Sequence, residues 1–381
     1  MDQLPRIPLQ CVPGTRGAVQ PLIVPVRLPS DGYHIHVGTD VLRQLGELYP
    51  PEAGARAALI SSTTVARLYA DVCLTSLRQA GWHVELLEVP DGEQAKTLAQ
   101  AGNLYSQCAR LGLDRGSTLF ALGGGVVGDL TGFVAGTYMR GISFVQIPTT
   151  LLAQVDASVG GKTAIDLPAG KNLVGVFHQP RLVVIDVGTL QTLSRRDLCA
   201  GMAEVIKHAA IADAEMFNFL AGAAPEVLAA EPSSLRRIVA RNCQIKAQVV
   251  EADPQERGIR ACLNYGHTVG HALELAACEW ELRHGEAVAW GMVAEARVAV
   301  KMRLADPEVP VALQALLQTY HLANEKPLLD FGRAREAILR DKKIVNGQLR
   351  LPLVPRIGEY VIRGDVPVAV LVEAMEEVLS D

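Results

Sequence analysis

The chain has 381 residues, of which 49% are hydrophobic and 20% are charged, a composition typical of a folded protein with a large core. Its 36 basic and 41 acidic side chains give a net charge of -5, which argues against a surface for nucleic acid or anionic membranes. No segment approaches the roughly 18 consecutive apolar residues of a membrane span. Seven cysteines without a C-x-x-C pair favour reduced thiols and a cytoplasmic location over a disulfide framework.

The first half of the chain alternates apolar runs with helical patterns. Prolines interrupt residues 1–30, so we expect an N-terminal extension with little regular structure and without a signal peptide. The intervening segments 66–80 and 98–111 have the period of helices. This alternation predicts an α/β domain over residues 31–189 with a Rossmann-like, mainly parallel sheet. Its expected strands are nearly continuous apolar runs, as in a sheet covered on both faces, at residues 57–61, 83–89, 117–124, 142–148 and 182–187.

Beyond about residue 188 the apolar residues recur with a helical period. Segments such as "RRDLCAGMAEVIKHAAI" and "GEAVAWGMVAEARVAVKM" are typical of buried helices. Only "QLRLPLV" (348–354) looks extended. We therefore expect an all-α C-terminal domain over residues 190–381.

A glycine turn in "LFALGGGVVGDLTGFVA" follows an expected strand and precedes an expected helix. Gly123, Gly125 and Gly128 satisfy G-x-G-x-x-G, a pattern that lets the backbone approach a pyrophosphate at a helix N-terminus. The acidic residue expected about 20 residues later, which would bind the ribose, is missing. The turn therefore indicates either a dinucleotide site of unusual pattern or a tight strand-to-helix connection.

The next stretch, "PTTLLAQVDASVGGKTAIDLPAGKNLVGVFHQP", collects polar residues on glycine-rich loops. Thr149 and Thr150 end an expected strand, where open α/β sheets bind ligands. Lys162, Lys171 and Asn172 suit a phosphate or a carboxylate. A solvated loop is the alternative for any one of these lysines.

Candidate metal ligands occur further along the chain. Glu204 lies three residues before Lys207, His267 and His271 share a helix face in "NYGHTVGHALE", and His284 precedes "GEAVAWG". A carboxylate with imidazoles is the ligand set of a catalytic zinc ion with an open position. Spacing alone favours His267 with His271 as the pair, and a buried histidine satisfied by a neighbour is the alternative for either.

Taken together, these segments closely resemble the 3-dehydroquinate synthase family of the sugar-phosphate cyclase superfamily. They occur in the family's order over roughly residues 33–364. The matching motifs are "DGEQAKT" (91–97), "GGGVVGDLTGFVAGTYMRG" (123–141), "PTTLLAQVDASVGGKTAI" (148–165), "GKNLVGVFHQP" (170–180), "GMAEVIKHA" (201–209), "RACLNYGHTVGHALE" (260–274), "HGEAVAWGM" (284–292) and "RDKK" (340–343).

The resemblance implies a dehydroquinate synthase-like fold with NAD and a divalent metal, zinc first and cobalt as the alternative. The family's zinc ligands fall on Glu204, His267 and His284, so the resemblance separates the histidine pair. His271 is then an active-site neighbour that handles protons. Arg140 matches an arginine that the family lends across the interface of a homodimer, where it contacts substrate.

Other family roles also carry over by position. Catalytic or substrate positions fall on Asp156, Lys162, Asn172, Lys207, Lys246, Arg260, Asn264, His271 and one of Lys342 and Lys343. NAD positions fall on Asp91, Gly92, Glu93, Gln94, Ala95, Lys96, Gly125, Val126, Val127, Gly128, Asp129, Thr149, Thr150, Lys162, Lys171, Thr189, Leu190, Gln191 and Thr192. Two departures stand out: Ser62 replaces the family's usual Asp or Asn, and residues 1–30 have no family counterpart.

The implied reaction converts 3-deoxy-D-arabino-heptulosonate 7-phosphate into 3-dehydroquinate and phosphate, a step of the shikimate pathway. It proceeds by transient oxidation with NAD, phosphate elimination, reduction, ring opening and aldol closure. Three alternatives are a cyclase of secondary metabolism, a metal-dependent dehydrogenase of the glycerol dehydrogenase type and an inactive binding protein. The dehydroquinate synthase reaction is favoured over another cyclase by retention of Lys246, Arg260, Asn264, His271 and "RDKK". A dehydrogenase would be expected to read G-G-G-S at the glycine turn. The filled polar positions argue against an inactive protein.

Overall fold

The computed structural model describes residues 10–11, 21–29, 32–277, 282–340, 344–345 and 348–380. These residues divide into two compact units. The first contains the described residues up to Leu193 together with Leu235–Glu251, and the second contains Ser194–Ser234 and the described residues from Ala252 onward. The sequence predicted one domain over 190–381, whereas residues 235–251, most of helix α7 (Pro232–Ala252), group with the first unit.

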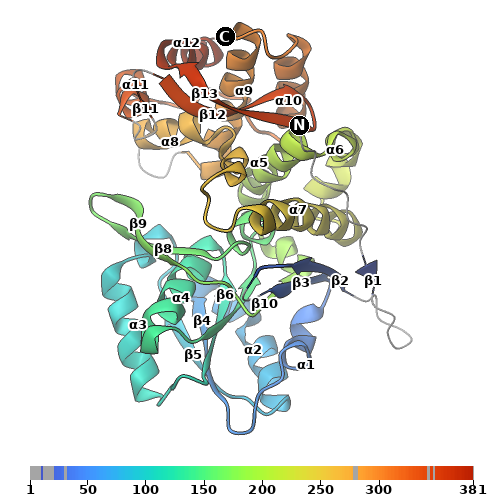
Figure 1. Cartoon of the computed structure of the whole chain (residues 1–381). Helices are drawn as coiled ribbons and strands as arrows, with labels where there is room; N and C mark the ends of the chain where they lie inside the picture. Colours follow the sequence, from blue (N-terminus) through green and yellow to red (C-terminus); the bar gives the residue numbers. More distant parts are fainter. Residues whose placement is uncertain are drawn as a thin grey trace. The chain divides into compact units, whose positions relative to one another are not determined.

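An eight-stranded sheet in the order β1-β2-β3-β10-β7-β6-β4-β5 forms the centre of the first unit (Figure 1). Six neighbouring strands, β3-β10-β7-β6-β4-β5, are parallel. At the other end of the sheet, β2 pairs antiparallel with β3, and β1 pairs antiparallel with β2. The predicted mainly parallel sheet is therefore confirmed. The strands are β1 (Gln10–Cys11), β2 (Leu22–Val26), β3 (Tyr33–Gly38), β4 (Arg56–Ser62), β5 (His83–Val89), β6 (Thr118–Gly123), β7 (Ser143–Pro148) and β10 (Leu182–Asp186).

Each face of this sheet has its own apolar core, because successive side chains of a strand point to opposite faces. Leu59 and Phe120 belong to one core, which also contains residues of α2. Ile60 and Leu119 belong to the other, which contains residues of α3 and α4. This double burial explains why the strands are apolar at nearly every position. The helices of this unit are α1 (Leu45–Leu48), α2 (Thr63–Gln79), α3 (Leu98–Arg110), α4 (Gly125–Thr137) and the included part of α7.

The first unit also contains elements that the sequence did not predict. Residues 22–26 form β2, so the segment 1–30 is not simply an extension with little regular structure. Polar and apolar residues alternate in β3, which differs from the continuous runs used to predict the other strands. A separate hairpin of β8 (Lys162–Leu167) and β9 (Gly170–Phe177) contacts α4.

The second unit is mainly helical, as predicted, but it is not all-α. A three-stranded antiparallel sheet of β11 (Ile344–Val345), β12 (Gln348–Arg356) and β13 (Glu359–Pro367) packs with its helices (Figure 1). The predicted extended segment 348–354 lies in β12. Residue Gly358 turns the chain into β13 with a φ of 90°. The helices are α5 (Arg195–Ala212), α6 (Ala214–Leu228), α8 (His267–Ala276), α9 (His284–Lys301), α10 (Glu308–Thr319), α11 (Phe331–Leu339) and α12 (Val368–Ser380).

Glycines allow α5, α8 and α9 to approach at backbone distance. A Cβ atom on Gly285 of α9 would lie 1.9 Å from the carbonyl oxygen of Ala200 in α5. A Cβ atom on Gly291 would lie 1.9 Å from the carbonyl oxygen of Gly266, which precedes α8. Because such overlaps are impossible, these helices can keep their separation only with glycine at both positions.

Two general expectations from the sequence can be compared with the described residues. Cys73, Cys108, Cys199, Cys243 and Cys262 are buried free thiols, in agreement with the expected reduced state. No helix in the part of the chain that the structure describes is both long and apolar enough to cross a membrane.

The close contact of α5 with α9 generates a stability prediction. Gly285→Ala should lower the free energy of unfolding by about 1–3 kcal/mol or more, because the methyl group overlaps the main chain of α5. Gly222→Ala is the matched control, since Gly222 is exposed in α6 and no atom lies within 4 Å of the added methyl group. The control should raise that free energy by about 1 kcal/mol through helix propensity. Denaturant unfolding measures both, and a Gly285→Ala protein as stable as the parent would contradict the contact.

Candidate active site

The carboxyl ends of the parallel strands place the predicted cofactor segments at one edge of the sheet. Residues Asp91–Lys96 follow β5, Gly125–Asp129 begin α4 after β6, Thr149 and Thr150 follow β7, and Thr189–Thr192 follow β10. Parallel strands end at the same edge, which is where open α/β sheets bind ligands. Segments separated by about a hundred residues in the sequence therefore lie along one edge.

The glycine turn between β6 and α4 is closely packed. A Cβ atom on Gly123 would lie 2.7 Å from the Val127 side chain, and one on Gly128 would lie 2.8 Å from Oε1 of Gln146. The first helical N–H that bonds back to the turn is that of Gly128, which donates to the Gly124 carbonyl at 3.1 Å. The preceding N–H groups have no partner four residues earlier in the helix, and together with the helix dipole they suit an anion.

Lys96 joins three parts of this edge. Its Nζ lies 2.5 Å from Oδ2 of Asp129 in α4 and 2.5 Å from Oδ1 of Asn172 in β9. The Lys96 carbonyl accepts a 2.7 Å hydrogen bond from the N–H of Asp166, and the Asp166 carboxylate accepts one from the N–H of Asn172. Burial raises the pKa of Asp129, and the charge of Lys96 opposes that rise. The hairpin β8–β9 is thereby fixed against the glycine turn.

Asp156 and Lys246 form a second close pair. Asp156 lies in the π-helical turn Ala153–Ala157, and Lys246 lies in the part of α7 that belongs to the same unit. The Nζ of Lys246 contacts the Asp156 carboxylate and donates to its main-chain carbonyl at 2.6 Å. Lys162 and Lys171, by contrast, are exposed on the hairpin β8–β9.

Residues that follow β10 and β4 form hydrogen bonds with other parts of the protein. Thr189 and Leu190 are buried, and the Thr189 hydroxyl donates to the Asp186 carbonyl at 2.8 Å. The Thr192 hydroxyl lies 2.6 Å from that of Tyr69. Beside Ser62, the hydroxyl of Thr64 donates to the Asp91 carboxylate at 2.7 Å and lowers the pKa of Asp91.

In the second unit the three predicted metal ligands lie together. Glu204 of α5, His267 at the start of α8 and His284 at the start of α9 each offer one ligand atom, all within 4.8 Å of one another. Both imidazoles direct Nε2 at the same carboxylate oxygen: Oε1 of Glu204 lies 3.6 Å from His267 and 3.5 Å from His284. The other oxygen, Oε2, contacts the buried ammonium group of Lys207.

The two histidines have opposite electrostatic environments. Burial, followed by the positive charge of Lys207, lowers the pKa of His267 to about 3. Burial also acts to lower the pKa of His284, but its hydrogen bonds to the carboxylates of Glu204 and Glu274 outweigh burial and raise that pKa to about 10. His267 is therefore a neutral imidazole with a lone pair, whereas a cation at the cluster would replace a proton on His284.

The other described residues that were predicted for this unit lie in α8 and in the 3-10 turn before it. The His271 ring lies 5.4 Å from that of His267 and 5.9 Å from that of His284. Arg260 is buried in the 3-10 turn Ile259–Asn264, and its Nη1 donates to the Pro254 carbonyl at 2.8 Å. Asn264 donates to the Glu256 carboxylate at 3.0 Å. Lys342 and Lys343 lie outside the described residues.

Two acidic residues at this site were not identified from the sequence. Glu256 contacts Asn264, and no sequence spacing identifies it. Glu274 forms a second group within 4.8 Å with His271 and His284. Its position could have been found, because residues 267, 271 and 274 follow the i, i+4, i+7 spacing of one helix face.

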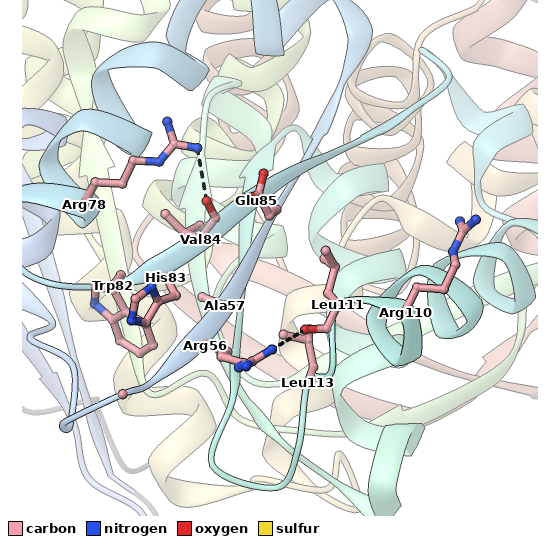
Figure 2. A pocket seen from close by; sticks show the side chains of 11 residues that line it. Arg56, Ala57, Arg78, Trp82, His83, Val84, Glu85, Arg110, Leu111 and Leu113 are labelled. Atoms are coloured by element: carbon pink, nitrogen blue, oxygen red, sulfur yellow. Dashed lines mark hydrogen bonds between the residues drawn. The ribbon is translucent and has the colours of Figure 1, made fainter.

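A pocket of about 790 Å³ in the first unit lies away from these residues (Figure 2). It is lined by the amino-terminal ends of β4 and β5 and by the residues before β6, so it lies at the sheet edge opposite the cofactor segments. Arg56 and Arg78 donate to the carbonyl groups of Leu111 and Val84, which fixes the surrounding loops. It contains none of the predicted site residues.

Comparisons with known proteins show the family to which the chain is similar. The family model for the N-terminal part of 3-dehydroquinate synthase matches residues 86–200, and the model for the C-terminal part matches 201–344. The 3-dehydroquinate synthase of Symbiobacterium thermophilum is 50% identical over 346 residues, which are 90% of this chain and 96% of that protein.

Solved structures of related cyclases are also similar. A 2-deoxy-scyllo-inosose synthase complexed with carbaglucose-6-phosphate, NAD+ and Co2+ is 27% identical with a TM-score of 0.87, and the match covers 93% of this chain and 99% of that one. The 2-epi-5-epi-valiolone synthase of Streptomyces hygroscopicus, with NAD+ and Zn2+ bound, is 27% identical with a TM-score of 0.83, covering 93% and 98%. The sequence matches extend over most of the chain, and this protein belongs to the 3-dehydroquinate synthase family.

Proposed function

We propose that this chain converts 3-deoxy-D-arabino-heptulosonate 7-phosphate into 3-dehydroquinate and phosphate, with NAD and a divalent metal as cofactors. Membership of a family of phosphate-eliminating lyases in the shikimate pathway gives the reaction class. The observation that carries the proposal is the cluster of Glu204, His267 and His284 around one carboxylate oxygen. Zinc is the expected ion, with cobalt as the alternative, since the two related cyclases contain one or the other.

The donor atoms of this cluster suit such an ion. Ligand atoms held tetrahedrally at about 2.0–2.2 Å from zinc lie about 3.3–3.6 Å from one another. Both Nε2 atoms are at this separation from Oε1 of Glu204. One carboxylate and two imidazoles leave an open coordination position for substrate. When bound, the ion supplies Lewis acidity toward hydroxyl and ketone oxygens of the substrate.

The glycine turn and the sheet edge suit the pyrophosphate of NAD. The helix α4 presents free N–H groups there, and Gly123 and Gly128 keep the turn compact. When bound, the nicotinamide supplies transient oxidation of one ring hydroxyl, which acidifies the adjacent C–H and permits phosphate elimination. We assign Asp91–Lys96, Gly125–Asp129, Thr149, Thr150 and Thr189–Thr192 to its binding, together with Lys162 and Lys171.

The cationic side chains would bind the two anionic groups of the substrate. We assign Lys162, Asn172, Lys207, Lys246 and Arg260 to this task, with Asn264 and one of Lys342 and Lys343. The planar guanidinium of Arg260 can hold a carboxylate with two parallel hydrogen bonds. Asp156 positions Lys246, and His271 at the metal cluster transfers protons during elimination and closure.

We further propose a homodimer in which Arg140 reaches the substrate of the second copy. Arg140 and Met139 are consecutive non-glycine residues with left-handed backbones, φ 69° and 52°. Each costs roughly 1–2 kcal/mol, so the turn that presents Arg140 is retained at the expense of stability. A reducing cytoplasmic location agrees with the buried free cysteines.

The metal assignment can be tested by removing ligands one at a time. Glu204→Gln, His267→Ala and His284→Ala should each abolish metal retention and activity, because two ligands cannot hold the ion through purification. His271→Ala should retain the metal, as should His83→Ala, an exposed histidine of the first unit. Elemental analysis of the purified variants measures this. Metal loss in His271→Ala together with retention in His284→Ala would reverse the assignment.

The role of NAD separates a cyclase from a dehydrogenase. Oxidation and reduction occur on the same substrate molecule, so NAD should be required but not consumed. The absorbance of NADH should stay flat over many turnovers, while phosphate release measured in the same cuvette shows that turnover continues. Accumulation of one NADH per product would identify a dehydrogenase instead.

The substrate itself is the third test. The purified protein with zinc and NAD should release phosphate from the heptulosonate phosphate, and it should act poorly on sedoheptulose 7-phosphate, which lacks the carboxylate. Sites built to bind a charged group reject analogues without it, because the hydrogen bonds and ion pairs to that group are then not formed. Arg260→Ala should narrow the difference in kcat/KM by damaging only the first reaction.

Arg335→Ala is the control for loss of a positive charge, since Arg335 is exposed on α11. It should leave both kcat/KM values unchanged. A higher kcat/KM for sedoheptulose 7-phosphate in the parent protein would replace the assignment with that of a secondary-metabolic cyclase.

A further inference from the structure

We propose that Glu274 is a positioning residue that orients His284 for metal binding. Its carboxylate would accept the Nδ1–H of His284, so that Nε2 keeps its lone pair toward Glu204 and His267. This inference rests on the metal site proposed above. It concerns a residue outside the three ligands and predicts how strongly the ion is held.

The two ring nitrogens of His284 face two different carboxylates. Nε2 lies 3.5 Å from Oε1 of Glu204 in α5, and Nδ1 lies 3.4 Å from Oε1 of Glu274 near the end of α8. A neutral imidazole carries one N–H, and the acceptor beside one nitrogen decides which nitrogen has the lone pair. A carboxylate at Nδ1 therefore selects the tautomer that binds a metal through Nε2.

His267 shows the same arrangement with a different acceptor. Its Nδ1 lies 3.1 Å from the main-chain carbonyl of Tyr265, and its Nε2 lies 3.6 Å from Oε1 of Glu204. The acceptor of His267 is part of the backbone and cannot be removed by a substitution. The acceptor of His284 is a side chain, so the contribution of the second contact can be measured by mutation.

Among the three cluster residues, the His284 side chain is the least restrained by burial and by its own helix. Its side chain is 30% exposed, compared with 12% for His267 and 0% for Glu204. It is the first residue of α9, so no preceding turn of its own helix restricts its ring. The carboxylate of Glu274, which comes from another helix, supplies that restriction.

The competing arrangement makes Glu274 a ligand of an ion held with His271 and Nδ1 of His284, since these three also lie within 4.8 Å. Two features favour the positioning role. Glu204 is fully buried, whereas His271 is exposed, so the ion gains more from the first cluster, where water screens its charge least. The first cluster also directs two imidazoles at one oxygen, which is the pattern of a formed site.

The test compares Glu274→Ala, Glu274→Gln and Glu373→Ala in the full-length chain. Glu373 is an exposed carboxylate of α12 that contacts Lys301, so its removal changes the net charge equally. Zinc affinity is measured by competition with a chromophoric chelator, and the visible spectrum of the Co2+ form reports ligand geometry. Glu274→Ala should weaken zinc binding by about 10- to 100-fold with one ion still bound per chain. Glu274→Gln should lose less, because its amide oxygen still accepts the Nδ1–H, and Glu373→Ala should lose nothing.

Three results would overturn the inference. Zinc affinity in Glu274→Ala equal to that of the parent would remove the positioning role. Loss of the ion in both Glu274→Ala and His271→Ala, with retention in His267→Ala, would make Glu274 a ligand. A lower thermal midpoint of the metal-free Glu274→Ala protein, with no recovery of affinity in Glu274→Gln, would indicate a structural role. Retention of metal in Glu204→Gln, His267→Ala and His284→Ala would instead refute the proposed metal site itself. The role of Glu274 in orienting His284 for metal binding would then be refuted as well.

Discussion

The backbone contact of α9 with its neighbours is the constraint on which the second unit depends. Gly285 meets the main chain of α5 at Ala200, and Gly291 meets the main chain at Gly266. Each contact lies next to a histidine of the proposed metal site, because His284 precedes Gly285 and His267 follows Gly266. Helices separated by larger residues would stand up to about 2 Å further apart. Glu204, His267 and His284 could not then bring one atom each within 4.8 Å of one another, so the glycines help to position this cluster.

In the first unit, parallel strands bring distant segments of the chain together. The segments that follow β5, β6, β7 and β10 all begin at one edge of its sheet. Polar contacts connect some of these segments. Lys96 links the loop after β5 to α4 and to β9 through Asp129 and Asn172. A buried lysine is costly unless it is paired, so the position of Lys96 depends on its contacts with Asp129 and Asn172. The edge that carries the proposed cofactor segments is therefore held by the ion pair of Lys96 with Asp129 as well as by the glycine turn.

The sequence predicted those features that depend on local pattern. The central strands are apolar at nearly every position because both faces are covered, and that makes them recognisable without tertiary information. Strands β2 and β13 were missed because proline, glycine and charged residues interrupt them, and their pairing partners define them. Spacing likewise favoured His267 with His271. The structure brings Glu204 and His284 to His267 from other helices, which no local spacing can reveal, and only the family resemblance indicated that set.

Pre-formed pairs also explain how an anionic substrate can be selected by cations that already have partners. Lys207 contacts Glu204, and Lys246 contacts Asp156, so each lysine is held in place before any ligand arrives. Under the proposed function, a phosphate or carboxylate of the substrate must compete with these acidic side chains. An anionic group can do so, whereas a neutral hydroxyl leaves the existing ion pairs unchanged and forms no ion pair of its own. Discrimination between substrates then depends on the difference in free energy between a lysine's ion pair with the substrate and its ion pair with the protein's own carboxylate. It does not require an unpaired buried charge, which would destabilise the fold.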